Sequence, residues 1–279
     1  MATSRRRTSA DRLLPKGALI GMVHVGALPG TPRASLSLGA IIDAALDDAR
    51  TLVKAGFDAV MIENMHDVPY VHGTQDPAVV AMMTRVGLAL REVLGEIPLG
   101  IQILSGGNRE ALAVALAVGA RFIRCENFVF SHVADEGLLE RAEAGPLLRY
   151  RRSIGAEHVR IFCDLKKKHA SHAITADVSL ADAAEAAEFF GADGLIITGA
   201  ATGRPTSLED VAEARHASTL PVLVGSGVTP DSAPALLEHA DALIVGSWIK
   251  AGGTWTGPVD AARAAKMVKA VAPRRRGRD

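Results

Sequence analysis

The sequence has few aromatic residues, few cysteines and no excess of charge of either sign. Aromatic residues make up 4% of the 279 residues, and Cys125 and Cys163 are the only cysteines. Two thiols in a chain of this length favour a reducing compartment, so we expect a cytoplasmic protein without structural disulfides. Lysine and arginine total 31, as do aspartate and glutamate. This balance gives no electrostatic reason to expect nucleic acid or an anionic membrane as a partner.

Several other sequence signals are also missing. No apolar run reaches the roughly 20 residues of a membrane-spanning helix, so we expect no insertion into a membrane. The motif G-x-G-x-x-G does not occur, which argues against a Rossmann dinucleotide site, and no cofactor is expected. The opening MATSRRRTSA lacks the apolar segment of a secretory signal. We expect residues 1–16 to be a flexible basic tail, with a short organelle transit peptide as the alternative, and residues 273–279 to be a basic C-terminal tail.

Between these tails, eight short apolar runs alternate with alanine-rich helical patterns. The runs are nearly continuous and rich in isoleucine and valine, which is typical of parallel strands buried on both faces. They cover residues 18–24, 58–64, 99–104, 121–127, 158–165, 193–199, 221–227 and 241–247. Hydrophobic residues make up 48% of the chain, enough for a sizeable core. Eight strand–helix units predict an α/β protein with a single (β/α)₈ TIM barrel over residues 17–272.

Helix boundaries are marked by caps and prolines. A glycine is predicted to end the helix before the second, fourth and sixth runs. Capping boxes predict helix starts at Ser179–Asp182 and Ser207–Asp210, and two prolines, Pro230 and Pro258, are expected at first helical positions. The longer loops, at residues 25–38, 65–76, 127–136 and 166–178, all follow strands. They would lie on the carboxyl face of the barrel, where barrel active sites are built.

The glycine-rich turns after the last two runs are the strongest local signal for ligand binding. Gly225-Ser226-Gly227 follows the seventh run and Gly246-Ser247 follows the eighth. Glycine lets the backbone approach an anion, and the helical turn that follows offers unpaired N–H groups. Loops at these two positions recurrently bind phosphate in barrels. The sequence therefore predicts a phosphorylated small-molecule ligand, although the same glycines could simply form tight turns.

A cluster of ionisable residues leaves the fifth run. Asp164 lies near its end and is followed by Lys166, Lys168 and His169. A partly buried lysine can act as a proton acceptor, neutralise an enolate or form a Schiff base. We therefore place these four residues among the candidate catalytic groups. A solvated basic loop is the alternative, and three adjacent lysines cannot all point inward.

Other polar residues end the remaining runs, where a barrel interior is normally apolar. Glu63 is a candidate general acid or base. Arg124 could clamp a substrate anion, or it could form a purely structural pair with Glu63. The candidate substrate-binding residues are His24, Asn64, Gln102, Arg124 and Thr198, together with the glycine-rich turns.

A metal site is not expected. The chain has nine histidines but no H-x-x-x-H motif and no closely spaced cysteine pair. His24, Glu63, Asp164 and His169 could converge on one divalent ion, which remains the alternative. The two cysteines fall on adjacent predicted strands and are interpreted as buried apolar groups.

Several segments together resemble the BtpA/SgcQ family. They are GALIGMVHVGALPGTPR, AGFDAVMIENMHDVPY, IPLGIQIL with Asn108, VGARFIRCENF, DLKKKHA, DGLIITGAATG, PVLVGSGVTPD and ADALIVGSWIK. The likeness covers roughly residues 17–271, in order. The resemblance implies a barrel of the ribulose-phosphate-binding type. The family takes its name from photosystem I biogenesis, and other members look like parts of sugar-utilisation gene sets. The resemblance assigns no catalytic residue.

Two functions follow from these observations. The first is an enzyme acting on a phosphorylated sugar or nucleoside-like compound, with isomerisation, epimerisation, aldol cleavage and glycosidic-bond cleavage all open. The second is a non-catalytic assembly or stability factor for a membrane complex such as photosystem I, which would need an exposed apolar patch. Phe128-Val129-Phe130, after the fourth run, is the candidate patch, with a lid or an oligomer contact as the alternatives. In either case we expect a homo-oligomer.

Overall fold

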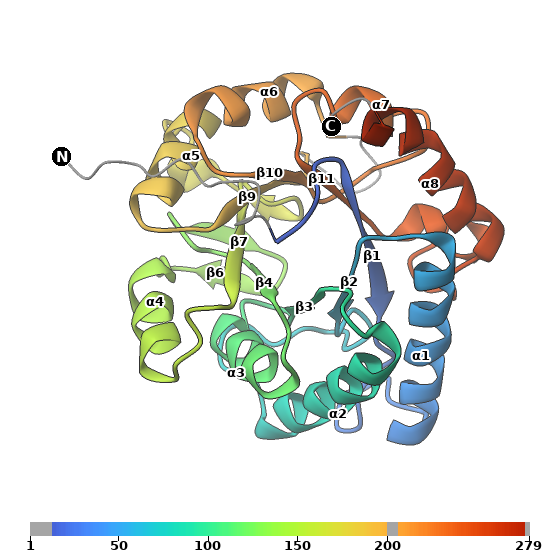
Figure 1. Ribbon diagram of the computed structural model, residues 1–279. Helices are drawn as coiled ribbons and strands as arrows, with labels where there is room; N and C mark the ends of the chain where they lie inside the picture. The colour runs from blue at the N-terminus through green and yellow to red at the C-terminus, as the bar shows by residue number, and fades with distance from the viewer. Residues whose placement is uncertain (1–12, 200–205, 277–279) are drawn as a thin grey trace.

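A closed barrel of eight parallel strands forms the centre of the computed structural model, which describes residues 13–199 and 206–276 (Figure 1). The strands follow one another around the barrel in the order β1-β2-β3-β4-β7-β9-β10-β11, and β11 pairs with β1 to close it. They are β1 (Ala18–His24), β2 (Ala59–Glu63), β3 (Leu99–Gln102), β4 (Phe122–Cys125), β7 (Arg160–Leu165), β9 (Gly194–Ile197), β10 (Val222–Val224) and β11 (Ala242–Val245). Each coincides with one predicted run, so the predicted fold class is confirmed.

Helices surround the barrel and cover the outer faces of its strands (Figure 1). They are α1 (Leu38–Ala55), α2 (Pro77–Leu94), α3 (Asn108–Val118), α4 (Ala144–Ser153), α5 (Leu180–Phe189), α6 (Leu208–Ala217), α7 (Ala233–Leu236) and α8 (Ala261–Arg276). The glycines predicted to precede the second, fourth and sixth runs, Gly56, Gly119 and Gly191, all have a positive φ. Gly56 and Gly119 are the C-caps of α1 and α3. Such a left-handed residue stops a helix and turns the chain toward the next strand.

The predicted helix starts are partly correct. At Ser179 the capping box is complete, whereas at Ser207 only the bond from the Asp210 N–H to the serine hydroxyl forms. The prolines expected at first helical positions are wrong. Helix α7 begins at Ala233, three residues after Pro230, and α8 begins at Ala261, after Asp260 accepts a bond from the Arg263 N–H. The Asp260 side chain caps the start of α8, whereas Ser232, directly before α7, makes no side-chain cap bond.

A second, three-stranded antiparallel sheet lies beside the barrel and was not predicted. It contains β5 (His132–Ala134), β6 (Gly137–Leu139) and β8 (Ala170–Ser171), in the order β6-β5-β8. Its strands come from the long loops after β4 and β7, so the sheet joins two neighbouring loops of the carboxyl face.

The barrel interior is filled by a separate apolar cluster. Phe122 and Phe162 lie with ring centroids 5.3 Å apart, and their partners in the cluster are small or aliphatic. Gly100 and Gly194 leave room for these rings, since a β-carbon at Gly194 would lie 2.7 Å from Phe162. A core filled this closely is a packed layer and leaves a ligand only the ends of the strands.

The ends of the chain differ from the predicted tails. Leu13 and Leu14 pack against the interior cluster, so the barrel domain begins before residue 17. At the other end, α8 continues to Arg276 through the first residues of the expected tail. Residues 1–12 and 277–279 of the predicted tails lie outside the described residues. Within the described parts of the chain, no helix is both long and apolar enough to cross a membrane.

Candidate functional site

The side chains that point into the barrel change character at the carboxyl ends of the strands. Side chains alternate between the two faces of a strand, so every second residue points inward. The inward series is apolar deep in the barrel and ends, on all eight strands, at a polar residue or a glycine. These eight residues, here called the strand-end ring, are His24, Glu63, Gln102, Arg124, Asp164, Thr198, Gly225 and Gly246. All eight are among the predicted site residues.

Register and packing confirm that neighbouring members face the same side. His24 pairs with Glu63 across β1 and β2, and Glu63 pairs with Gln102 across β2 and β3. On the opposite side, a β-carbon at Gly225 would lie 3.2 Å from Thr198 and 3.5 Å from Arg124 Nη2. The ring is therefore continuous around the end of the barrel.

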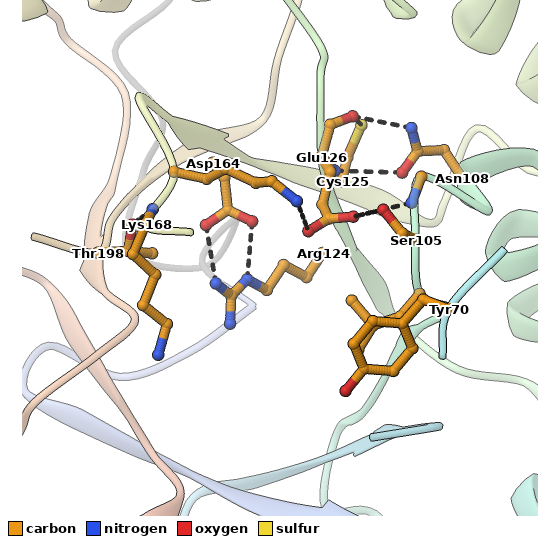
Figure 2. Close-up of polar contacts among 12 residues, drawn as sticks. Tyr70, Ser105, Asn108, Arg124, Cys125, Glu126, Asp164, Lys168 and Thr198 are labelled. Atoms are coloured by element: carbon orange, nitrogen blue, oxygen red, sulfur yellow. Dashed lines mark hydrogen bonds and ion pairs between the residues drawn. The ribbon is translucent and has the colours of Figure 1, made fainter. Parts of the chain in front are cut away.

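Arg124 and Asp164 form a two-pronged ion pair at the centre of this group. Figure 2 shows both bonds, from Nε to Oδ2 and from Nη2 to Oδ1, each 2.9 Å long. Burial lowers the pKa of Arg124, but the adjacent Asp164 carboxylate outweighs it and raises the pKa, so the guanidinium stays charged. The structural pair of Arg124 with Glu63, one of the two alternatives from the sequence, does not form, because Arg124 pairs with Asp164. Glu63 instead makes no hydrogen bond to any described residue through its side chain and lies 3.9 Å from His24 Nε2.

Burial disfavours the charged forms of both Glu63 and His24. Burial raises the pKa of Glu63 to about 7, and the neighbouring Arg124 guanidinium only partly opposes this. Burial, together with the positive charge of Lys250, lowers the pKa of His24 to about 3. A carboxyl group that titrates near pH 7 can either accept or donate a proton under physiological conditions.

Lys168 connects the strand-end ring to the predicted phosphate turn. Its backbone N–H donates to Thr198 Oγ1 at 3.0 Å, and its Nζ donates to Ser226 Oγ at 2.9 Å. Burial and the nearby Arg124 guanidinium lower the pKa of this lysine. Lys168 thus brings an ammonium group from the β7 loop to the turn after β10.

The two glycine-rich turns begin on neighbouring strands. β10 and β11 pair in parallel, with Val224 opposite Leu243, so the turns start about 5 Å apart. Gly227 has a φ of 66°, a conformation that favours glycine, and Ser247 opens a short 3₁₀ turn, η3 (Ser247–Ile249). Among the described residues, the N–H groups of Ser226, Gly227, Gly246 and Ser247 have no hydrogen-bond partner. Four such donors on adjacent turns suit an anion.

Glu126 and Lys167 form a second buried ion pair, and neither residue was among the predicted site residues. Lys167 Nζ lies 2.8 Å from Glu126 Oε1, and the Gly106 N–H donates to Glu126 Oε2 at 2.8 Å. Figure 2 shows the Asn108 side chain bonded to the Glu126 backbone, at 2.8 Å to its carbonyl and 3.2 Å from its N–H. Glu126 lies two residues beyond Arg124, so alternation along the strand could have placed it on the inward side.

Three predicted site residues lie away from the strand-end ring. Asn64 points outward, where its side chain accepts from the Leu104 N–H at 2.7 Å and donates to Asp67. Lys166 has a φ of 43° and interacts with Asp182 at the start of α5. His169 is exposed, and the charged groups that act on it include Asp135 and Glu136 in the loop after β4.

No metal centre forms in residues 13–199 and 206–276, where no three His, Cys, Asp or Glu side chains are placed to hold an ion. The alternative set of metal ligands, His24, Glu63, Asp164 and His169, therefore does not converge on one ion. Cys125 and Cys163 lie opposite each other on β4 and β7 as free, buried thiols, and burial raises the pKa of both. Their interpretation as buried apolar groups is confirmed.

Comparison with known proteins assigns the sequence to a family. A sequence model described as "BtpA family" matches residues 15–273. A mitochondrial protein of Caenorhabditis elegans, described as uncharacterized, is 46% identical over 91% of this chain and 92% of its own length. The photosystem I biogenesis protein BtpA of Synechocystis is 36% identical over 91% of this chain and 88% of its own.

Solved structures with the same fold are more distant in sequence. Thiamine phosphate pyrophosphorylase from Pyrococcus furiosus superposes with a TM-score of 0.56 at 16% identity, covering 94% of this chain and 97% of that one. N-(5'-phosphoribosyl)anthranilate isomerase from the same organism gives 0.55 at 11% identity, covering 92% and 99%. At such identities the likeness shows the barrel fold alone.

Proposed function

The chain belongs to the BtpA family, and we propose that it is an enzyme acting on a phosphorylated sugar or nucleoside-like small molecule at the carboxyl end of its barrel. The observation that carries this proposal is the bond between Lys168 and Ser226, which links the ionisable residues of the strand-end ring to the glycine-rich turns. A ligand whose phosphate lies on the turns would have its carbon skeleton over the ring. Binding and proton-transfer groups would then act on one molecule.

The phosphate end of the site is built mainly from backbone. The N–H groups of Ser226, Gly227, Gly246 and Ser247 supply donors without side-chain entropy, and the Ser226 hydroxyl is buried beside them. Lys168 adds a positive charge within hydrogen-bond distance of that hydroxyl. The two structural relatives support the assignment, since their names contain phosphorylated compounds, thiamine phosphate and a phosphoribosyl group.

The chemical end of the site offers a proton acceptor and a positive charge. Above pH 7 the Glu63 carboxylate can take a proton from a carbon next to a carbonyl group. The electron pair of that C–H bond then moves to the carbonyl oxygen, where Lys168 or Arg124 stabilises the negative charge. Isomerisation and epimerisation share this step. In aldol cleavage the base instead takes the proton of the β-hydroxyl group, and the electron pair of the broken C–C bond moves to the same carbonyl oxygen. Asp164 holds the Arg124 guanidinium in place through both of its oxygens.

Calorimetric titration with phosphate esters tests the proposal. We expect the native chain to bind a sugar phosphate, and Lys168→Met to weaken binding of inorganic phosphate at least tenfold. Lys54→Met, at an exposed lysine of α1, is the matched control and should leave affinity unchanged. Equal phosphate affinity in both variants would show that Lys168 and the glycine-rich turns do not form the phosphate site.

A second function, a non-catalytic role in the assembly of a protein complex, has its own supporting observation. The predicted patch is mostly buried: Phe128 lies in the core, Val129 packs against it and only Phe130 is exposed. The small sheet is more apolar on its surface, where Val133 and Leu138 face each other across β5 and β6 with 40% and 51% of their area exposed. In an affinity capture, a partner protein that binds the native chain and Lys168→Met, but is lost when Val133 and Leu138 are replaced, would favour this function.

We further propose that the protein works in the cytoplasm as a homo-oligomer. The two free, buried thiols suit a reducing compartment. Phe189 and Phe190, at the end of α5, are stacked edge to face, and Phe189 is 83% exposed, which suits a contact between subunits. Light scattering on the native chain and on Phe189→Ser tests the oligomer: a monomer in both would end that part of the proposal.

A further inference from the structure

The carboxyl end of the barrel is divided into a half rich in hydrogen-bond donors and a half that offers mainly acceptors. Arg124, Lys168 and Ser226 lie on the half formed by β4, β7 and β10 and carry charged or hydroxyl donors. On the half formed by β1, β2 and β3, the inward residues are His24, Glu63 and Gln102, here called the acceptor arc. The two halves would bind chemically different ends of one ligand.

His24 can only accept a hydrogen bond at this face. Its Nδ1 lies 2.7 Å from the carbonyl oxygen of Trp255, so Nδ1 carries the proton and donates it. Burial and the charge of Lys250 keep the ring neutral, which leaves a lone pair on Nε2. That atom faces inward, 3.9 Å from Glu63 Oε2 and near Gly246.

Gln102 and Glu63 extend the same pattern. Gln102 is 2% exposed, and its Oε1 is buried without a hydrogen-bond partner among the described residues. The Glu63 carboxyl also lacks a hydrogen bond within the described part of the chain. An unsatisfied buried acceptor typically costs about 1–3 kcal/mol, so the Gln102 oxygen, next to the Glu63 carboxyl group and the His24 lone pair, favours a ligand that brings donors.

The charge of the ligand at this end follows from the same residues. A carboxylate placed against the acceptor arc would face the His24 Nε2 lone pair, the unpaired Gln102 Oε1 and the Glu63 carboxyl group. Burial raises the pKa of that carboxyl group, and the Glu126 and Asp164 carboxylates help to raise it. The amide N–H groups of Gln102 would be the main side-chain donors to the carboxylate in the arc. Hydroxyl groups can donate to His24, Glu63 and Gln102 without adding charge.

We propose that the ligand of this site is a phosphate monoester of a polyhydroxylated carbon chain or ring, whose hydroxyl groups donate to His24, Glu63 and Gln102, and not a phosphorylated carboxylic acid. This inference rests on the proposed function, because it takes the phosphate position from the glycine-rich turns. It adds the class of the substrate and the residues that select it.

Calorimetric titration of the full chain separates the two ends of the ligand. The probes are inorganic phosphate, a panel of pentose and hexose monophosphates, and the matching phosphorylated aldonates, in which a carboxylate replaces the carbonyl carbon. We expect at least one sugar phosphate to bind tenfold or more tightly than inorganic phosphate, and no aldonate to do so. An aldonate that binds more tightly than its sugar phosphate would overturn the proposal.

Variants of the acceptor arc provide the second arm. Gln102→Leu removes the unpaired oxygen, and His24→Asn keeps a donor for the Trp255 carbonyl while removing Nε2. Each should lose at least fivefold in sugar-phosphate affinity and less than twofold in affinity for inorganic phosphate. His158→Asn, an exposed histidine at the other end of the barrel, is the control. Thermal unfolding confirms that each variant is folded.

The outcomes distinguish the inference from the proposed function. If the native chain binds neither inorganic phosphate nor any ester, the phosphate site and the inference both fail. If phosphate binds normally but Gln102→Leu and His24→Asn bind the sugar phosphate as the native chain does, the phosphate site stands and the acceptor arc is refuted.

Discussion

Replacing Glu63 by glutamine should stabilise the protein at alkaline pH while removing its proposed proton acceptor. Glu63 is buried at the end of β2 with no hydrogen bond to the described residues, and burial raises its pKa from the ordinary 4.5 to about 7. Since a tenfold change in proton affinity corresponds to about 1.4 kcal/mol, ionising this group in the folded chain costs about 3 kcal/mol. Glutamine has nearly the same shape and never ionises.

The pH at which this cost appears follows from the two pKa values. Below pH 4.5 the carboxyl is protonated in both the folded and the unfolded chain, so the cost is absent. Between pH 4.5 and about 7 the unfolded chain loses this proton first, and stability falls as pH rises. Above about pH 7 the folded chain carries the full cost.

Urea unfolding at about pH 4 and about pH 8.5 measures the effect. We expect Glu63→Gln to be more stable than the native chain by up to about 3 kcal/mol at the higher pH, and to match it within about 0.5 kcal/mol at the lower one. Glu92→Gln, at an exposed position of α2, corrects for the loss of a surface carboxylate. A difference between Glu63→Gln and the native chain that is the same at both pH values would refute the assigned environment of Glu63.

Three further predictions concern the barrel end and its surroundings. Arg124→Met should cost about 3–5 kcal/mol in urea unfolding, because it leaves Asp164 buried without a partner, whereas Arg152→Met breaks an exposed pair and should cost less than about 1 kcal/mol. Gly225→Ala should lower the melting temperature by overpacking worth about 1–3 kcal/mol, since its β-carbon would lie 2.6 Å from Ile196. Gly246→Ala, whose nearest neighbour would be 3.5 Å away, should change the melting temperature less. Cys125 and Cys163 should react with a thiol reagent only in denaturant, because both are buried and their thiolate forms are disfavoured; rapid labelling of the native chain would contradict this.

The barrel and most of its strand-end ring could be predicted from the sequence because two simple periodicities determine them. Each strand is a short continuous apolar run, and eight runs separated by helices suffice for closure. Because side chains alternate between the two faces of a strand, the position of the last polar residue then decides whether its side chain points into the barrel or away from it. Glu63 and Asn64 illustrate the limit, since both end the same run and both were candidates, yet only Glu63 faces inward while Asn64 bonds to the neighbouring loop.

The lysines after β7 could not be placed in this way. Alternation from Asp164 would turn Lys166 inward, but Lys166 adopts a φ of 43° and interrupts the strand geometry. The side chains that face the site are consequently Lys167, bonded to Glu126, and Lys168, bonded to Ser226. A positive φ at a lysine has no local sequence signal, because its cost is offset by contacts with distant segments. The small sheet was missed for a similar reason, since it pairs two loops far apart in the chain.

The most direct test of the central claim is a crystal structure of the protein grown with a sugar phosphate. The account predicts that the N–H groups of Ser226, Gly227, Gly246 and Ser247 bind the phosphoryl group, within hydrogen-bond distance of Lys168 Nζ. The hydroxyl groups of the sugar should point toward His24 and Gln102. Density for the phosphoryl group elsewhere on the molecule, with Lys168 still bonded to Ser226 and the four N–H groups facing only water, would contradict it.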